Sequence, residues 1–359
     1  MREHHRSPAV RQLVEDFTEQ IRSGKLRPGD YLPSAHSLAE SYDIGYTTVI
    51  RAYKTLSEAG LIETVQGRGA FVRHSHEITS ITEITVVLPS QDILSQTGNP
   101  HSDWVFHELL AGMNGATLAR GIRLHLHFAD NIGAQWPAIC AGLRGGVLFV
   151  LQAPPPWVLR LERLRIPYAL VLPMMSADWE AEIPCSAPDF FGGVHAAVTA
   201  VLKTGRTRAA YVGETAIGTE GPRYDGCVAA LAETGGTLVE TIPCPEISRA
   251  AGRKAIESYL AEHPVPDFDL LVAANDNRAL GALEALSAHG LRVPEDIAVL
   301  GFDDIPAAAD AGLSTVHLPM RDLGEASLHW LLDTVAPHPG AEPPHLTLPC
   351  PVVWRGSTG

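Results

Sequence analysis

Apolar runs of strand length alternate with segments of helical spacing over most of this chain of 359 residues. Clear apolar runs are ITVVLPS from residue 84, VLFVL from residue 147 and IAVLGFDD from residue 297. Helical spacing recurs near residues 104–119, 190–203, 223–233, 250–261 and 277–288. This alternation predicts an α/β fold in which helices flank parallel sheets. Because the stretch 84–359 is long for one sheet, we expect two lobes.

The first 75 residues show a different pattern, three short helices followed by a β-hairpin. A first amphipathic helix ends at Gly24, Ser34 can cap a second, and a third begins after Asp43-Ile44-Gly45. LIETV and AFVRH then alternate as strands around a glycine-rich tip. The order predicts a winged helix-turn-helix domain over residues 1–75 and a polar linker at 76–83. The two-lobed body would follow, its first lobe at about 84–188 and 317–345, its second at about 189–316 and 346–359.

Charge is distributed unevenly between these two parts. The whole chain has a formal net charge of −14, which argues against nucleic acid as a partner. Residues 1–75, however, hold 10 basic and 9 acidic side chains, so the remaining residues hold 17 and 32. A near-neutral N-terminal unit beside an acidic body is compatible with DNA binding by the small unit alone.

A helix-turn-helix reads DNA because the N-terminal residues of its second helix reach base edges in the major groove. Tyr46, Thr47, Thr48 and Arg51 occupy that position here. Taken singly, each of the cations Arg51, Lys54 and Arg68 is as readily a solvated surface charge. The full set of expected DNA contacts is Ser34, His36, Tyr46, Thr47, Thr48, Arg51, Lys54, Gly67, Arg68 and Gly69.

The run LPSAHSLAESYDIGYTTVIRAYKTLSEAGLIETVQGRGAFV, residues 32–72, resembles the GntR family of winged-helix regulators. Two departures from the family pattern stand out. Ala35 and His36 precede the second helix's Leu-Ala where the family usually has Glu-Arg, and Gly45-Tyr46 replaces a common Ser-Arg. One habitual phosphate-contacting arginine is therefore missing, and dimerisation would double the remaining contacts.

Four polar residues of the body follow predicted strands, where ligands lie in sheets of this kind: Asp189, Arg223, Asn275 and Asp303. Helix capping explains Asp189 and Asn275 equally well. Arg223 opens a helix whose dipole it opposes, which favours a role as a donor to a ligand.

Residues 83–359 resemble the effector domain of the LacI/GalR family, itself similar to periplasmic sugar-binding proteins. The resemblance rests on PDFFGGVHAAVTAVLKTGRTRAAYVGE, RYDGCVAAL, AANDNRALGALEALSAHGLRVPEDIAVLGFDDIP and VVWRGST. It implies that the four polar residues contact an effector, plausibly a carbohydrate, and that the protein is a dimeric repressor released from operator DNA by that effector. Trp104 or Phe106 would stack on a sugar ring, although such aromatics more often belong to a core.

Rival functions fit the sequence less well. Winged-helix heads also occur fused to aminotransferase-like enzymes, but the body's only lysines, Lys203 and Lys254, lie at polar helix positions. His125, His127 and Asp130 would suit a metal, yet alternate strand residues more often form an exposed face. A sugar-binding protein without a regulatory role would need an export signal, and the N-terminus shows none. We therefore expect no enzyme activity, no cofactor and no metal.

The cysteines and the hydropathy pattern suggest a compartment. The five cysteines form no C-x-x-C pair, which favours a reducing environment. No stretch of about 18 apolar residues is present, so we expect a cytoplasmic protein without membrane contact.

Overall fold

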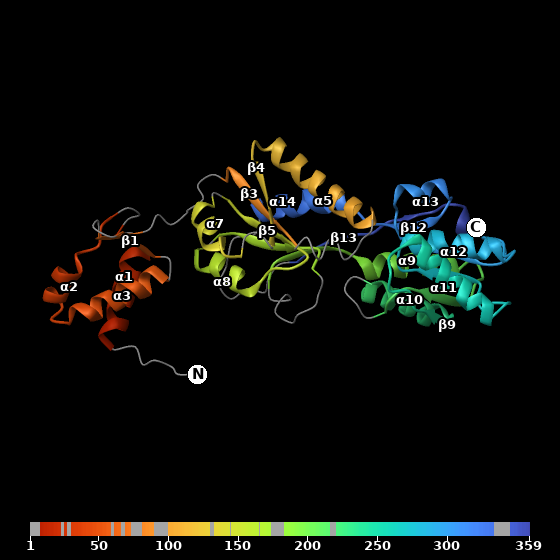
Figure 1. Ribbon diagram of the computed structural model, residues 1–359, viewed down its shortest axis with the longest axis horizontal. Helices are drawn as coiled ribbons and strands as arrows, with labels where there is room; N and C mark the ends of the chain where they lie inside the picture. The colour runs from red at the N-terminus through yellow and green to blue at the C-terminus, as the bar shows by residue number, and fades with distance from the viewer. Residues whose placement is uncertain are drawn as a thin grey trace.

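The computed structural model describes residues 8–22, 25–26, 30–58, 61–65, 69–72, 81–89, 100–129, 133–143, 145–164, 166–173, 183–215, 220–333 and 345–359. Three bodies follow one another along the long axis of the molecule (Figure 1). They are an N-terminal head and two lobes, each lobe with its own six-stranded sheet.

The head is the expected bundle of three helices with a two-stranded wing. Its elements are α1 (Pro8–Arg22), α2 (Ala35–Ser41), α3 (Tyr46–Glu58), β1 (Ile62–Val65) and β2 (Gly69–Val72). The wing strands pair antiparallel, with Val65 opposite Gly69. Phe17 of α1 packs edge-on against Tyr53 of α3, whose hydroxyl donates a hydrogen bond to the Pro33 carbonyl at 2.6 Å. The residues between the wing strands lie outside the described part of the chain.

The first lobe holds a parallel sheet with the strand order β13-β7-β6-β5-β3-β4. Its strands are β3 (Glu83–Leu88), β4 (Arg123–Phe128), β5 (Val147–Val150), β6 (Tyr168–Val171), β7 (Cys185–Pro188) and β13 (His345–Leu348). The central strands are buried on both faces, so they read as continuous apolar runs. Helices α5 (Pro100–Ala119) and α14 (Met320–Asp333) pack on one face, and α7 (Trp136–Gly142) and α8 (Pro155–Leu164) on the other.

Two glycines bring α5 and α14 into backbone contact. A Cβ atom on Gly112 would lie 2.0 Å from the Arg321 carbonyl oxygen, and one on Gly324 would lie 2.1 Å from that of Leu109. The helices therefore cross closer than side chains would permit. Ion pairs secure the crossing at both ends, from Arg321 to Glu108 and from Arg120 to Asp333.

The second lobe repeats the plan with the strand order β14-β12-β11-β10-β8-β9, in which only the edge strand β14 is antiparallel. Its strands are β8 (Arg208–Val212), β9 (Thr237–Ile242), β10 (Leu270–Ala273), β11 (Ala298–Asp303), β12 (Ser314–His317) and β14 (Val352–Val353). Its helices are α9 (Phe190–Leu202), α10 (Glu220–Thr234), α11 (Arg249–Glu262), α12 (Asp276–Ala288), α13 (Pro306–Asp310) and the 3₁₀ turn η2 (Gly356–Thr358). Helices α9 and α10 cover one face, and α11 and α12 the other.

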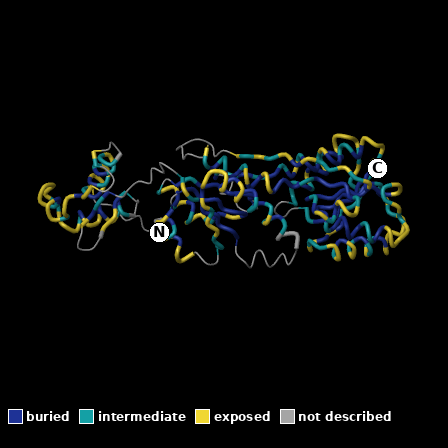
Figure 2. The backbone as a smooth tube through the Cα atoms, turned by 90° about the horizontal axis from the view of Figure 1, so that it is seen from above, coloured by how far each residue is buried: buried dark blue, intermediate teal, exposed yellow. Residues whose placement is uncertain are grey.

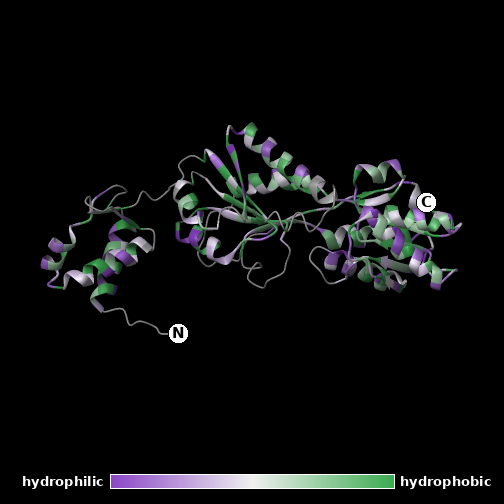
Figure 3. Ribbon diagram, in the orientation of Figure 1, coloured by the Kyte–Doolittle hydropathy of each residue, from purple (hydrophilic) through white to green (hydrophobic). Residues whose placement is uncertain are grey.

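The chain crosses between the lobes three times, after β7, after β12 and after β13. The third crossing comes later than the sequence pattern suggested, because His345–Leu348 pair with β7 in the first sheet. One buried apolar cluster continues through this region, from Leu323 and Leu109 to Val194 and Val316. The buried strands form a continuous interior in both lobes (Figure 2), and hydropathic colouring places the apolar residues on them (Figure 3).

Candidate functional site

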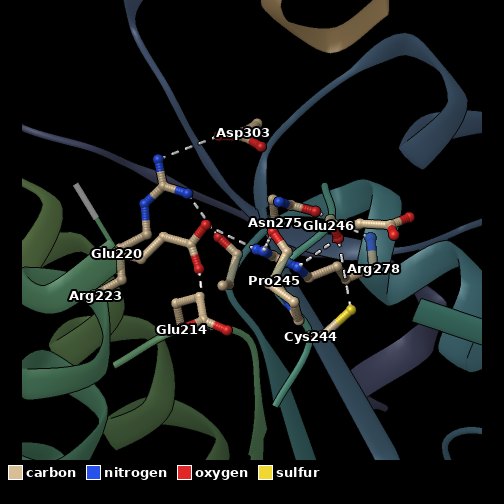
Figure 4. A network of polar contacts seen from close by, with 10 residues as sticks. Glu214, Glu220, Arg223, Cys244, Pro245, Glu246, Asn275, Arg278 and Asp303 are labelled. Atoms are coloured by element: carbon tan, nitrogen blue, oxygen red, sulfur yellow. Dashed lines mark hydrogen bonds and ion pairs between the residues drawn. The ribbon is translucent and has the colours of Figure 1, made fainter. Parts of the chain in front are cut away.

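Arg223, in the first turn of α10, is a buried cation at the carboxyl end of the second sheet. Its side chain is only 7% exposed. One guanidinium nitrogen, Nη1, donates to the Ala274 carbonyl at 2.6 Å, and Nη2 lies 3.6 Å from Oδ1 of Asp303 (Figure 4). The guanidinium also lies over the Phe302 ring, 3.9 Å from its centroid, and 5.0 Å from that of Phe190. The Arg223 cation is therefore in contact with the faces of two aromatic rings.

Asp303 ends β11 with a backbone φ of 116°, and Asp304 follows with φ of 62°. Positive φ is costly for residues other than glycine, and such strain persists only where neighbouring contacts hold it. Asp304 supplies such contacts, because its carboxylate pairs with Arg355 at 2.7 Å and with His317 at 3.0 Å. The side chain of Asp303 is thereby fixed toward Arg223, fully buried.

Asn275 and Asp189 both cap helices, the alternative that the sequence left open. Asn275 Oδ1 accepts a hydrogen bond from the Arg278 amide at 3.0 Å, and Asp189 Oδ1 accepts one from the Gly192 amide at 2.8 Å. Asn275 adjoins the carbonyl that Arg223 contacts. The carboxylates of Asp189 and Asp303 and the Arg223 cation all influence Cys350, whose pKa rises to about 12 chiefly through burial. The four residues therefore lie around one region.

Asp276 places a second buried carboxyl beside Asp303. It accepts hydrogen bonds from the Ile305 amide at 2.9 Å and from Thr315 Oγ1 at 2.6 Å. Burial, followed by the charge of Asp303, raises the pKa of Asp276 to about 8. The hydrogen bond from the Ile305 amide to Asp276 holds the loop that follows Asp303 in place. With its pKa raised in this way, the Asp276 carboxyl is mostly protonated at neutral pH.

Sequence reasoning missed the pair formed by Glu220 and Arg278. Arg278 is fully buried, its Nη1 lies 2.9 Å from Glu220 Oε1, and its other nitrogens donate to the carbonyls of Pro245 and Glu246 (Figure 4). Glu220 Oε2 also accepts from the Glu214 amide at 2.9 Å. The pair joins α10 to α12, immediately beneath Arg223 and Asn275. The signal available was an arginine within the otherwise apolar run after Asn275.

The aromatic candidates lie on α5. Phe106 is half-buried and packs against the apolar cluster that runs between the lobes, while Trp104 packs against that cluster and against the one beneath α12. These contacts are those of core residues, so a ligand contact by Phe106 stays a prediction.

Most of the described residues expected to contact DNA are exposed on the head. Tyr46 at the start of α3 is 45% exposed, and the His36 ring of α2 stacks on it at a centroid distance of 4.5 Å. Thr47, Arg51 and Lys54 are exposed and Thr48 is half-buried. Ser34 caps α2 by accepting from the Ser37 amide at 3.1 Å, and Gly69 has a φ of 93° at the wing. Gly67 and Arg68 lie outside the described residues.

The residues named for rival functions are placed as follows. Lys203 caps α9 and Lys254 lies on α11, both exposed. His125 lies on the outer strand β4, and its Nε2 is 3.4 Å from the carboxylate of Glu83 on β3. Asp130 lies outside the described residues. Within the described part of the chain no group of three or more metal-ligating side chains gathers. No described helix is long and apolar enough to span a membrane.

The head has the helix-turn-helix arrangement that places a helix in a DNA groove. The two lobes, linked by three crossings, have buried charges at the carboxyl end of one sheet, where ligands bind in such folds. Together these features define a DNA-binding regulator with an effector domain. Comparison with known proteins agrees. Residues 9–72 match the family of bacterial regulatory proteins, gntR family, and residues 198–358 match the periplasmic binding protein-like domain. The chain belongs to the transcriptional repressors with a LacI-type effector domain, here carrying a gntR-type head, and is a ligand-responsive, DNA-binding transcriptional regulator.

Three similar proteins illustrate the relationship. The HTH-type transcriptional repressor PurR of Erwinia tasmaniensis is 30% identical over 64% of this chain and 69% of its own. The arabinose metabolism transcriptional repressor of Geobacillus stearothermophilus is 23% identical over 91% of both chains. The solved transcriptional regulator CelR–cellobiose complex shares the fold, with a TM-score of 0.61 and 22% identity over 91% of this chain and 100% of that chain. These relatives are regulators of transcription rather than enzymes.

Proposed function

We propose that this protein is a repressor that leaves its operator when a carbohydrate binds between the two lobes. The observation that carries the proposal is the buried Arg223–Asp303 pair beside the rings of Phe302 and Phe190. Sugars offer vicinal hydroxyls, which suit bidentate charged partners, and apolar ring faces, which suit aromatic side chains. Arabinose, in the name of one relative, and cellobiose, in one similar structure, indicate the class of effector.

Each site residue has a role in this proposal. Asp303 accepts from sugar hydroxyls and Arg223 donates to them, both held by the contacts described above. Asn275 and Asp189 use the polar capacity that helix capping leaves free, since an amide or carboxylate can make several hydrogen bonds. Phe106 on α5 packs against the sugar ring from the first lobe. Neither a cofactor nor a metal takes part, and the chain catalyses no reaction.

The partner of the head is double-stranded operator DNA in the cytoplasm. Tyr46, Thr47, Thr48 and Arg51 read base edges, while Ser34, His36, Lys54 and the wing at 67–69 contact phosphates. We take residues 1–75 as the DNA-binding domain and 84–359 as the effector domain, with the lobes meeting near residues 188, 317 and 348.

A homodimer completes the proposal. Strand β4 is an outer strand with exposed side chains, and Leu126 on it and Leu118 at the end of α5 are large exposed apolar residues. A strand edge flanked by apolar side chains is a natural self-association surface. Two heads related by a two-fold axis would read a near-palindromic operator.

The sugar acts through its preference for one arrangement of the lobes. Because a ligand shifts an equilibrium only by its differential affinity, the sugar must bind the arrangement that holds the two heads out of register with the half-sites. The effector and the operator then weaken each other's binding by the same factor.

Fluorescence anisotropy with labelled DNA from the gene's own upstream region tests the proposal. We expect tight binding that arabinose, cellobiose or lactose reverses, with reversal lost in Arg223→Gln and Asp303→Asn while DNA affinity stays. Arg253→Gln, which removes an exposed cation on α11, is the matched control and should respond like the wild type. Sugar binding measured by calorimetry without any DNA binding would instead indicate a carbohydrate-binding protein with no regulatory role.

Arg51→Ala tests the register of the reading helix. Because Arg51 is exposed on α3, opposite the buried Val49 and Ala52, the variant should fold normally. Its loss should weaken operator binding by about tenfold or more, as expected for one bidentate base contact. Circular dichroism checks the fold and anisotropy the affinity; unchanged affinity would contradict the placement of Arg51 in the groove.

A further inference from the structure

A pocket of about 460 Å³ lies between the head and the first lobe, remote from the residues of the effector site. Its walls come from α7, α8 and the C-terminal end of the DNA-reading helix α3. They include Trp136, Trp157, Leu159, Arg160, Arg163 and Ser57. The volume falls within the range of small-molecule sites, which is about 300–1,000 Å³.

Two buried donors in these walls have no acceptor. The indole Nε1 of Trp136 and the Nε of Arg160 are both buried, and no described residue accepts a hydrogen bond from either. Trp136 as a whole is 2% exposed, so its N–H has no ready access to water. Buried polar atoms are normally satisfied, and an exception calls for a missing partner. Because both atoms are closed to water, they lie behind the pocket wall, and an occupant of the pocket does not reach them as the side chains stand.

The charge of the pocket points to an anionic partner. Arg160 and Arg163 lie three positions apart on α8 and both line the pocket, whereas no described lining residue is an aspartate or glutamate. The protein carries a formal net charge of −14, so two arginines that line one pocket without a described acidic lining residue are unusual within it. An anion would compensate the two guanidinium groups together.

The rest of the wall is apolar and flat. Trp136 and Trp157 stack with ring centroids 4.9 Å apart and planes 21° from parallel, and Leu159 is 51% exposed beside them. Such a surface suits a ring or a flat hydrocarbon rather than a hydrated inorganic ion.

We propose that the pocket between α3, α7 and α8 is a second small-molecule site, which binds a planar organic anion such as an aromatic carboxylate. The anionic group accepts from the guanidinium groups of Arg160 and Arg163, and the ring lies against Trp157 and Leu159. Because Ser57 of α3 belongs to the same wall, a molecule bound here contacts the helix that reads DNA. The site is independent of the sugar site proposed above.

The test uses 1-anilinonaphthalene-8-sulfonate, an aromatic anion whose emission rises in apolar surroundings, with the full-length protein. We expect a saturable rise that benzoate reverses and benzamide, its neutral counterpart, does not. Arg160→Gln should weaken binding by about tenfold, the usual loss for a charged hydrogen bond. Arg163→Gln should also weaken it and serves if the first variant does not fold.

Two controls locate the bound probe. Arg253→Gln removes one exposed cation elsewhere and should leave the affinity for the probe unchanged. Arg223→Gln, at the sugar site, should also leave it unchanged. The proposal is overturned if wild-type protein gives no saturable emission, if both α8 variants bind the probe like wild type, or if benzamide competes as well as benzoate.

Discussion

At the scale of single residues, the second lobe is distinguished by a group of buried charged side chains. Arg223, Asp303, Arg278, Glu220 and Asp276 all lie within the carboxyl end of one sheet or directly beneath it. Removing one member of a buried pair leaves an uncompensated charge, which costs far more than the intact pair contributes. The same low dielectric that fixes these groups makes them sensitive to substitution and to pH.

Glu220→Gln is expected to be among the more damaging single substitutions in the lobe. It leaves Arg278 fully buried with neutral acceptors in place of its carboxylate countercharge, and should lower the free energy of unfolding by roughly 3 kcal/mol. Arg253→Gln, which breaks an exposed pair with Glu257, should cost less than about 1 kcal/mol. Urea denaturation compares the two. Equal losses would show that burial of Arg278 has no energetic consequence, and Glu220→Gln combined with Arg278→Met should recover part of the loss.

Asp276 should make stability depend on pH in a defined direction. Its pKa rises from an ordinary value of 3.8 to about 8 on folding, so the folded state favours the protonated carboxyl. Its contribution is therefore fully present below about pH 4 and is lost as the pH rises through about 8. In Asp276→Asn the melting temperature should fall less than in wild type over this interval. Parallel curves from the two proteins in differential scanning fluorimetry would rule out the assignment.

At the scale of elements, close helix contacts set the spacing of one helix pair in each lobe. Helices α5 and α14 meet through Gly112 and Gly324, and α11 and α12 meet in the same way through Gly252 and Gly281. These contacts leave no room for a Cβ atom, so each helix pair has a fixed spacing.

Gly112→Ala and Gly115→Ala form a matched pair on α5. The methyl group at 112 would meet the Arg321 backbone, whereas nothing lies within 4 Å of one at 115. We expect Gly112→Ala to destabilise the protein by about 1–3 kcal/mol through overpacking. Gly115→Ala should stabilise it by about 0.5–1 kcal/mol, because alanine is the better helix former. The melting temperatures of both variants test these expectations. A Gly112→Ala variant that melts above the wild type would contradict the close approach of α5 and α14 at this position.

Some elements could be predicted from sequence and others could not, for physical reasons. The central strands were recognisable because burial on both faces demands unbroken apolar runs such as VLFV and LLVA. The strands β7, β12, β13 and β14 escaped notice because CSAP, STVH, HLTL and VV are short, partly polar or at a sheet edge. Arg223 was noticed through its unfavourable place near a helix start, whereas Arg278 was not noticed and Asp276 was taken only as part of a helix cap. Their roles depend on partners distant in sequence, which periodicity does not report.

At the scale of the whole molecule, charge is separated between the head and the body. In the function proposed above, the head contacts DNA phosphates, whose neutralisation releases counterions, while the body holds a sugar by local hydrogen bonds. The two activities should therefore respond differently to salt, although they are coupled through the lobes.

Raising the salt concentration should separate them. The logarithm of the operator association constant is expected to fall linearly with the logarithm of the salt concentration, with a slope set by the number of phosphate contacts. Lys54→Gln should reduce the magnitude of that slope by about one. The sugar dissociation constant should change little over the same range, because Arg223 and Asp303 are buried from the ions. Anisotropy and calorimetry give the two curves; an equally steep curve for the sugar would place its site on the surface.

The last fifteen residues supply an outer strand to each of the two sheets, β13 to one and β14 to the other. Neither lobe can consequently be complete while the ribosome is still adding residue 345, even though the first lobe begins near residue 83. Both halves of the receptor should reach their final form only once residues 345–353 have been synthesised, and truncation near residue 340 would leave two unfinished sheet borders exposed to aggregation.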